Sequence, residues 1–175
     1  MPDFSEVYEC WVEEEPPAME DVLDPPPEEG GWARHLLETL GFTIHIHEGV
    51  QRGDPFHDGS ALHFSLQGGD HRTYQHELAH AIVWITYGRP GTPRQWGIGS
   101  SPYRRRAAEL EILVSTVEWV LGDRYLEKGD RSTTQAMEDA FGPNHREPDR
   151  RLTPAMVVEA IRMVDLVLGP QVSSH

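Results

Sequence analysis

The stretch that most constrains how this chain folds is an apolar stripe between residues 74 and 85. Five apolar residues recur there at the three- and four-residue intervals of an α-helix: Tyr74, Leu78, Ala81, Ile82 and Ile85. Gly88, followed by Arg89 and Pro90, supplies the signals that end a helix. The stretch therefore predicts an amphipathic helix with one face buried against the rest of the protein.

Two histidines and a glutamate lie on the flank of this predicted helix, in the run His76-Glu77-Leu78-Ala79-His80. Imidazoles four residues apart on a helix are neighbours, about 5–6 Å apart at Cβ, so both can reach one Zn²⁺ at roughly 2.0–2.1 Å. Glu77 lies beside the pair and can take a proton from a water bound to the ion. The H-E-x-x-H pattern predicts a zinc site with Glu77 as its base. The alternative is two surface histidines on an ordinary core helix.

A third zinc ligand has to come from another part of the chain. The longer pattern H-E-x-x-H-x-x-G-x-x-H is not present, because Val83 and Thr86 hold the positions of its Gly and last His. The remaining common solution is a carboxylate from a later helix. Residues 102–121 predict such a helix, and its candidates are Glu109, Glu111 and Glu118. Glu109 and Glu111 lie on opposite shoulders of its apolar stripe, so periodicity does not separate them.

Shorter patterns predict a small sheet and three further helices. Alternation over residues 42–47 and 61–66 predicts two strands, with residues 49–60 as a loop between them. Residues 31–40, 132–141 and 154–168 have helical spacing. These elements predict the α+β class, mostly helical.

Both predicted strands carry a functional hypothesis. His45 and His47 share one face of the first strand and are a candidate second metal site, against a plain polar face exposed to solvent. An exposed edge of the second strand would let an extended peptide substrate pair with it by strand addition, against an ordinary strand with no such role.

The first 30 residues differ in composition from the rest. They hold 11 acidic residues and no Lys or Arg, and so account for most of the net charge of −14 of the whole chain. Repeated Pro and self-repelling carboxylates predict an extended or partly ordered arm over residues 1–30, before a nearly neutral domain over residues 31–175. Helical spacing also recurs at Phe4, Val7, Tyr8, Trp11 and Val12 and predicts a short helix that docks somewhere on the protein. The arm is a candidate to bind a basic protein partner or to occupy the substrate cleft.

The single cysteine and the lack of long apolar runs limit the setting. Cys10 cannot form an intrachain disulfide; it is either a small apolar residue or a thiolate that caps the zinc in a latent form. We see no signal-peptide pattern and no membrane-spanning run, and the charge distribution argues against a nucleic-acid partner. A reducing, cytoplasmic location is expected.

The run from His71 to His80 resembles the R-F-T-x-A-H-E-L-G-H run of the ImmA/IrrE-type peptidases, within the gluzincin branch of the zincin superfamily. Residues 108–111, Ala-Glu-Leu-Glu, resemble the E-x-E-A helix of that group. The resemblance implies a zincin-like fold with a small β-sheet packed on the H-E-x-x-H helix, and zinc bound by His76, His80 and Glu111. Ala79 stands where that group has Gly, and Ile112 where it has a small residue. Glu109 stays the fallback ligand.

The expected function is zinc-dependent peptide-bond hydrolysis, by an endopeptidase rather than an exopeptidase. Glu77 would activate the zinc-bound water and pass the proton to the leaving amine. Tyr103 and His145 are candidate donors to the transition-state oxyanion. Two alternatives are a zincin-fold binding module, whose acidic arm contacts a basic partner without turnover, and metal-dependent hydrolysis of a substrate other than a peptide.

Overall fold

The computed structural model describes residues 4–9, 22–23, 31–47, 56–58, 60–65, 71–89, 101–125 and 154–170. The helices are α1 (Ser5–Glu9), α2 (Gly31–Thr39), α3 (His71–Thr86), α4 (Ser101–Tyr125) and α6 (Pro154–Leu168). The strands are β1 (Val22–Leu23), β2 (Thr43–His47), β3 (Phe56–Asp58) and β4 (Ala61–Ser65). The described part is mostly helical with one small sheet, as the α+β class predicts. The predicted helix over residues 132–141 lies outside the described residues.

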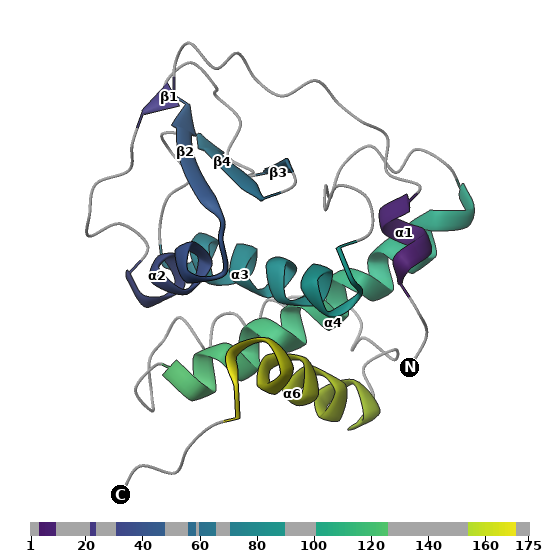
Figure 1. The fold of residues 1–175 in the computed structure, drawn as a ribbon. Helices are drawn as coiled ribbons and strands as arrows, with labels where there is room; N and C mark the ends of the chain where they lie inside the picture. The colour runs from purple at the N-terminus through teal and green to yellow at the C-terminus, as the bar shows by residue number, and fades with distance from the viewer. Residues whose placement is uncertain are drawn as a thin grey trace, which may run out of the picture.

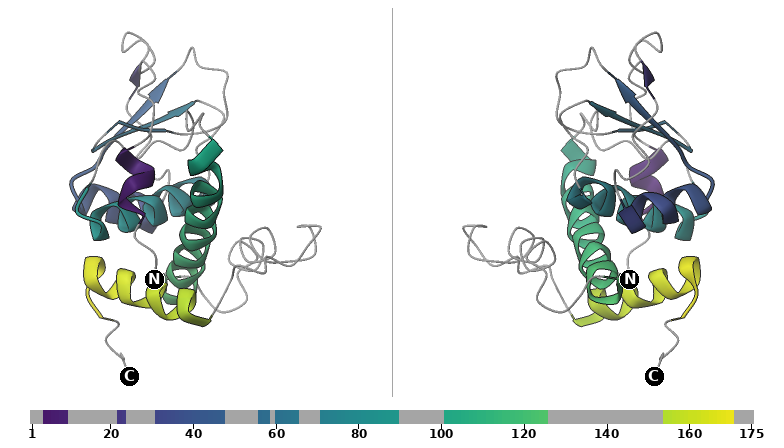
Figure 2. Two further views of the ribbon diagram at one scale, coloured as in Figure 1. Left: turned by 90° about the vertical axis from the view of Figure 1, so that its right-hand side faces the viewer. Right: turned by 90° about the vertical axis from the view of Figure 1, so that its left-hand side faces the viewer.

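Helices α3 and α4 form the centre of the molecule. Figure 1 shows the sheet on one side of α3 and α6 on the other, and in Figure 2 α4 crosses α3 at a steep angle. The apolar stripe of α3 is buried except for the half-buried Ile85, and the predicted stripe of α4 is fully buried: Leu110, Leu113, Val114, Val117 and Leu121. The apolar stripes predicted from the sequence therefore lie on α3 and α4 and contribute to one hydrophobic core. No helix in the described ranges is long and apolar enough to span a bilayer.

The sheet has four strands in the order β1-β2-β4-β3. Strands β2 and β4 pair in parallel, and the two outer strands are antiparallel to their neighbours. The isoleucines Ile44 and Ile46 of β2 are buried, as are Leu62 and Phe64 of β4. The Phe64 ring stacks on Tyr74 of α3, with ring centroids 4.4 Å apart. The apolar face of the sheet therefore packs on the helix that carries His76 and His80.

Two expectations for this region are wrong. Residues 56–58, expected to lie in a loop, form β3 and pair with β4. Of the two alternatives for β4, an exposed edge for a peptide or an ordinary strand, the exposed edge is wrong for residues 61–63, because β4 lies between β2 and β3 and these residues pair with both. The outer strands are β1 and β3.

Part of the acidic arm belongs to the folded core. Phe4, Val7 and Tyr8 at helix α1 are almost completely buried. The Phe4 ring packs edge-on against Tyr87, just after α3, and lies under the guanidinium of Arg106 in α4. The predicted short helix therefore docks where the C-terminal end of α3 meets the N-terminal half of α4 (Figure 1).

Candidate metal centre

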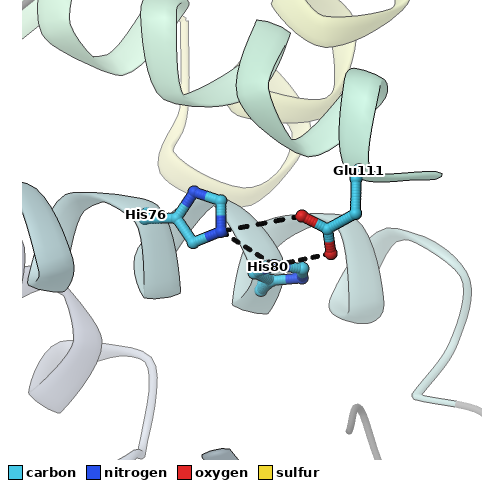
Figure 3. Close-up of side chains that lie close together, drawn as sticks. All are labelled: His76, His80 and Glu111. Atoms are coloured by element: carbon cyan, nitrogen blue, oxygen red, sulfur yellow. Dashed lines mark hydrogen bonds and ion pairs between the residues drawn. The ribbon is translucent and has the colours of Figure 1, made fainter. Parts of the chain in front are cut away.

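Three potential metal ligands from two helices converge on one point. The Nε2 atoms of His76 and His80 in α3 are 3.2 Å apart. From α4, Glu111 places Oε1 3.3 Å from Nε2 of His80 and Oε2 3.8 Å from Nε2 of His76. Figure 3 shows the two rings and the carboxylate turned toward one another. One ligand atom from each residue lies within 4.8 Å of the others, so the side chains face a common centre.

The far side of the His76 ring is held by a second carboxylate. Nδ1 of His76 is 2.9 Å from Oε2 of the buried Glu118. The backbone carbonyl of Glu118 in turn accepts a hydrogen bond of 3.0 Å from the Gln75 side-chain amide. When His76 is neutral, donation from Nδ1 to Glu118 leaves the lone pair on Nε2, which faces His80 and Glu111. Glu118 therefore fixes both the orientation of the ring and the nitrogen that can bind a cation.

The charges around His76 favour a cation at this centre. Burial lowers the pKa of His76, but the hydrogen bond to Glu118 and the charges of Glu77, Glu118 and Glu111 outweigh it and raise the pKa to about 9. For Glu111 burial acts in the other direction and raises the pKa. The charge and hydrogen bond of His80 and the charge of His76 outweigh this effect, so the pKa of Glu111 is lowered. The carboxylates of Glu118, Glu77 and Glu111 thus stabilise positive charge on the His76 ring.

The separations fit a tetrahedral zinc ion. Two nitrogens that each lie about 2.0–2.1 Å from such an ion are roughly 3.3 Å apart, and the two Nε2 atoms are 3.2 Å apart. The rings are nearly perpendicular, at 81°, so each lone pair can point at the shared centre. Two imidazoles and a carboxylate are also a common donor set of catalytic zinc sites, which leave a fourth position open. The residues present therefore fit the ion that the sequence predicts.

Glu77, the expected base, is buried next to His76 in α3. Its side chain is only 2 % exposed, and its charge is close enough to raise the pKa of His76. Its place next to His76 on α3 follows from the sequence, since a neighbour in a helix points about 100° away from the ring.

The other two glutamates considered as zinc ligands, Glu109 and Glu118, have different partners. Glu109, the fallback ligand, is not part of the group formed by His76, His80 and Glu111 in the described residues; it pairs with Arg106, Nη1 to Oε2 3.6 Å. Glu118, also considered as a ligand, contacts the outer nitrogen of His76 instead of the shared centre. Cys10, His145 and the side chains of Tyr103 and His47 lie outside what the structure describes.

Sequence reasoning missed two residues near the centre. The role of Glu118 as an outer partner had a usable signal, because Glu118 follows Glu111 by seven residues and so lies on the same face of α4. Tyr8 had none. Its phenol is buried, and burial followed by the charges of Glu111 and Tyr87 raises its pKa. Helix α1 therefore places the Tyr8 phenol close enough to Glu111 for the carboxylate charge to raise its pKa.

Replacing Glu118 by Gln should weaken zinc binding about 10- to 100-fold, the usual effect of losing an outer carboxylate partner. The amide keeps the shape of the side chain but no longer offers a negative charge to Nδ1 of His76. A zinc titration against a chromophoric chelator measures the change. Asp123→Asn, at an exposed position of the same helix, should leave the affinity unchanged. Equal affinities in both variants would remove Glu118 from the site.

Without metal, the stability of the protein should fall as the pH rises from about 6.5 to 9. Folded His76 has a pKa of about 9 against an ordinary value of 6.5, so the folded state holds a proton that the unfolded state releases. This stabilisation is complete below the unfolded pKa of 6.5 and is lost as the pH rises through the folded pKa of about 9. Its size is about 3 kcal/mol. Urea unfolding in a chelator at pH 6 and pH 9.5 measures it. The loss should be clearly smaller in Glu118→Gln; an equal loss would assign it to other groups.

Comparison with protein-family models, with curated proteins and with solved structures finds no match for this chain. The features that bear on function are therefore the geometry of the cluster and the resemblance of residues 71–80 and 108–111.

Proposed function

We propose that this protein is a zinc-dependent peptidase whose ion is held by His76, His80 and Glu111. The observation that carries the proposal is the 3.2 Å separation of the two Nε2 atoms, with a Glu111 oxygen 3.3 Å from one of them. That spacing suits a single tetrahedral ion. Glu118 supports it because its carboxylate keeps the Nε2 lone pair of His76 directed at the same point.

The chemistry divides between the ion and the protein. A zinc ion held by His76, His80 and Glu111 would supply a Lewis acid that lowers the pKa of water towards about 7. Glu77 takes the proton of the attacking water and delivers it to the leaving amine, so that a poor leaving group departs neutral. Its burial and the effect of its charge on the pKa of His76 support a place for the carboxylate close to the proposed ion. The peptide substrate, internal cleavage and the zincin-like fold rest on the resemblance of the Glu77 run, and a cytoplasmic location rests on the single cysteine.

The binding-module alternative depends on acidic side chains of the arm, of which the described Glu6 is exposed. Phe4, Val7 and Tyr8 are buried in the core of this same chain, so this segment does not present its apolar residues to a partner.

Metal analysis and peptide digestion of the full chain test the proposal together. We expect one tightly bound zinc per chain at the cluster, cleavage of a mixed peptide library detected by mass spectrometry, loss of cleavage with a chelator and recovery with added zinc. Zinc without cleavage of any library member would favour a binding module or a substrate other than a peptide. Absence of tightly bound zinc would overturn the proposal.

A further inference from the structure

A second pair of histidines lies in the sheet, outside the cluster of His76, His80 and Glu111. His45 of β2 and His63 of β4 are direct partners in the parallel register. Their ring centroids are 5.3 Å apart and their planes are inclined by 30°. Buried apolar residues flank both histidines along their strands: Ile44, Ile46, Leu62 and Phe64. Because side chains alternate between the faces of a strand, the two imidazoles lie together on the face opposite the one that packs on α3.

The surroundings of this pair are unusual for ordinary polar side chains. His63 is only 2 % exposed although it is a polar residue on the face turned away from the helices. Nδ1 of His45 is buried and has no hydrogen-bond partner among the residues that the structure describes. A buried imidazole nitrogen without a hydrogen-bond partner costs the folded protein free energy. A ligand that binds to this nitrogen would remove that cost.

We propose that His45 and His63 form a second binding site, for a divalent transition cation of the zinc, copper or nickel class. Imidazole nitrogen suits these cations, whereas Mg²⁺ and Ca²⁺ prefer oxygen ligands. Two imidazoles that share a tetrahedral ion at about 2.0–2.1 Å have ring centroids roughly 5 Å apart, close to the separation of this pair. Rotation about χ2, a broad torsion in histidine, turns one nitrogen of each ring toward the shared point.

The backbone makes this site distinct from the first. The two histidines sit on paired strands, whose register is fixed by the burial of the isoleucines and of Leu62 and Phe64 on the other face. Within the described ranges no third imidazole, thiol or carboxylate completes a set of three with them. With two ligands among the described residues, against three at the cluster on α3 and α4, the site should bind zinc more weakly than that cluster.

Zinc titration of the full chain by calorimetry, with no other ligand present, tests this proposal. We expect wild-type protein to bind a tight first equivalent and a weaker second one at His45 and His63. His45→Gln and His63→Gln should each lose the second equivalent and keep the first. His35→Gln, at an exposed position of α2, is the matched control and should keep both. Histidine ¹⁵N chemical shifts should report perturbation of two imidazoles during the second step, whatever the activity of the protein.

The variant His80→Gln separates this proposal from the proposed function. It should lose the tight equivalent and keep the weaker one, because the two sites share no residue. If the weaker equivalent survives in both His45→Gln and His63→Gln, or is lost only in His80→Gln, the second site is overturned. A failed peptidase assay would leave this result unaffected.

Discussion

Glu77→Gln should reduce peptide cleavage about 10²- to 10⁴-fold while zinc stays bound. General acid–base catalysis contributes a factor of this size, and glutamine cannot take a proton from water or pass one to a leaving amine. The substitution preserves the shape of a side chain that is 2 % exposed, so the fold should persist. Cleavage of the best peptide from the library and zinc content by mass spectrometry provide the two readouts.

The control for this variant is Glu38→Gln, at an exposed position of α2, which should cleave at the wild-type rate. Full activity in Glu77→Gln would show that another group moves the proton. Loss of zinc together with activity would instead make Glu77 a residue that holds the site together. Only loss of turnover with retained zinc supports its assignment as the base.

The central helices could be predicted from the sequence because their apolar stripes are long. Helix α3 spans residues 71–86 and α4 spans residues 101–125, so each repeats its pattern over several turns. Most of their stripe residues are buried as expected. The spacing of His76 and His80 within α3 also set their separation without any help from the rest of the fold.

Short elements could not be predicted in the same way. Strand β3 has three residues and exists because residues 56–58 pair with β4, a long-range contact that leaves little alternation in the sequence. Helix α1 has five residues, too few to be stable alone, and its docking site is chosen by the packing of Phe4 against Tyr87 and Arg106. Its spacing predicted the helix but not that Tyr8 would lie near Glu111.

The apolar periodicity of α4 does not decide which glutamate is the third ligand, but other residues on the helix do. Glu109 and Glu111 lie about 100° to either side of the apolar stripe of α4, so the stripe alone treats them equally. Glu118 lies on the shoulder of Glu111, and Arg106 pairs with Glu109 on its own side of the helix. Glu111 and Glu118 are seven residues apart and so lie on the same side of α4. From there Glu111 reaches the Nε2 side of the two histidines, and Glu118 reaches Nδ1 of His76.

Glu111→Gln should therefore weaken zinc binding by at least about 100-fold, beyond the usual range for an outer partner such as Glu118. It removes the only carboxylate that the structure, within the residues it describes, groups with His76 and His80 as a possible metal ligand. Glutamine keeps the shape of a side chain that is 44 % exposed, so the metal-free protein should still fold, and thermal unfolding in a chelator measures what the lost charge beside His76 and His80 costs. Competition with a chelator of known zinc affinity measures the binding change.

Glu109→Gln is the matched control, since it is the same substitution on the same helix two residues away. Its carboxylate faces Arg106, so zinc affinity should stay at the wild-type value. The reverse result, with zinc lost in Glu109→Gln and kept in Glu111→Gln, would mean that α4 is rotated about its axis relative to α3 when the ion is bound. Retention of zinc in both would contradict a ligand from either position and would move the third donor to another part of the chain, because two imidazoles alone do not hold zinc as tightly as a set of three ligands.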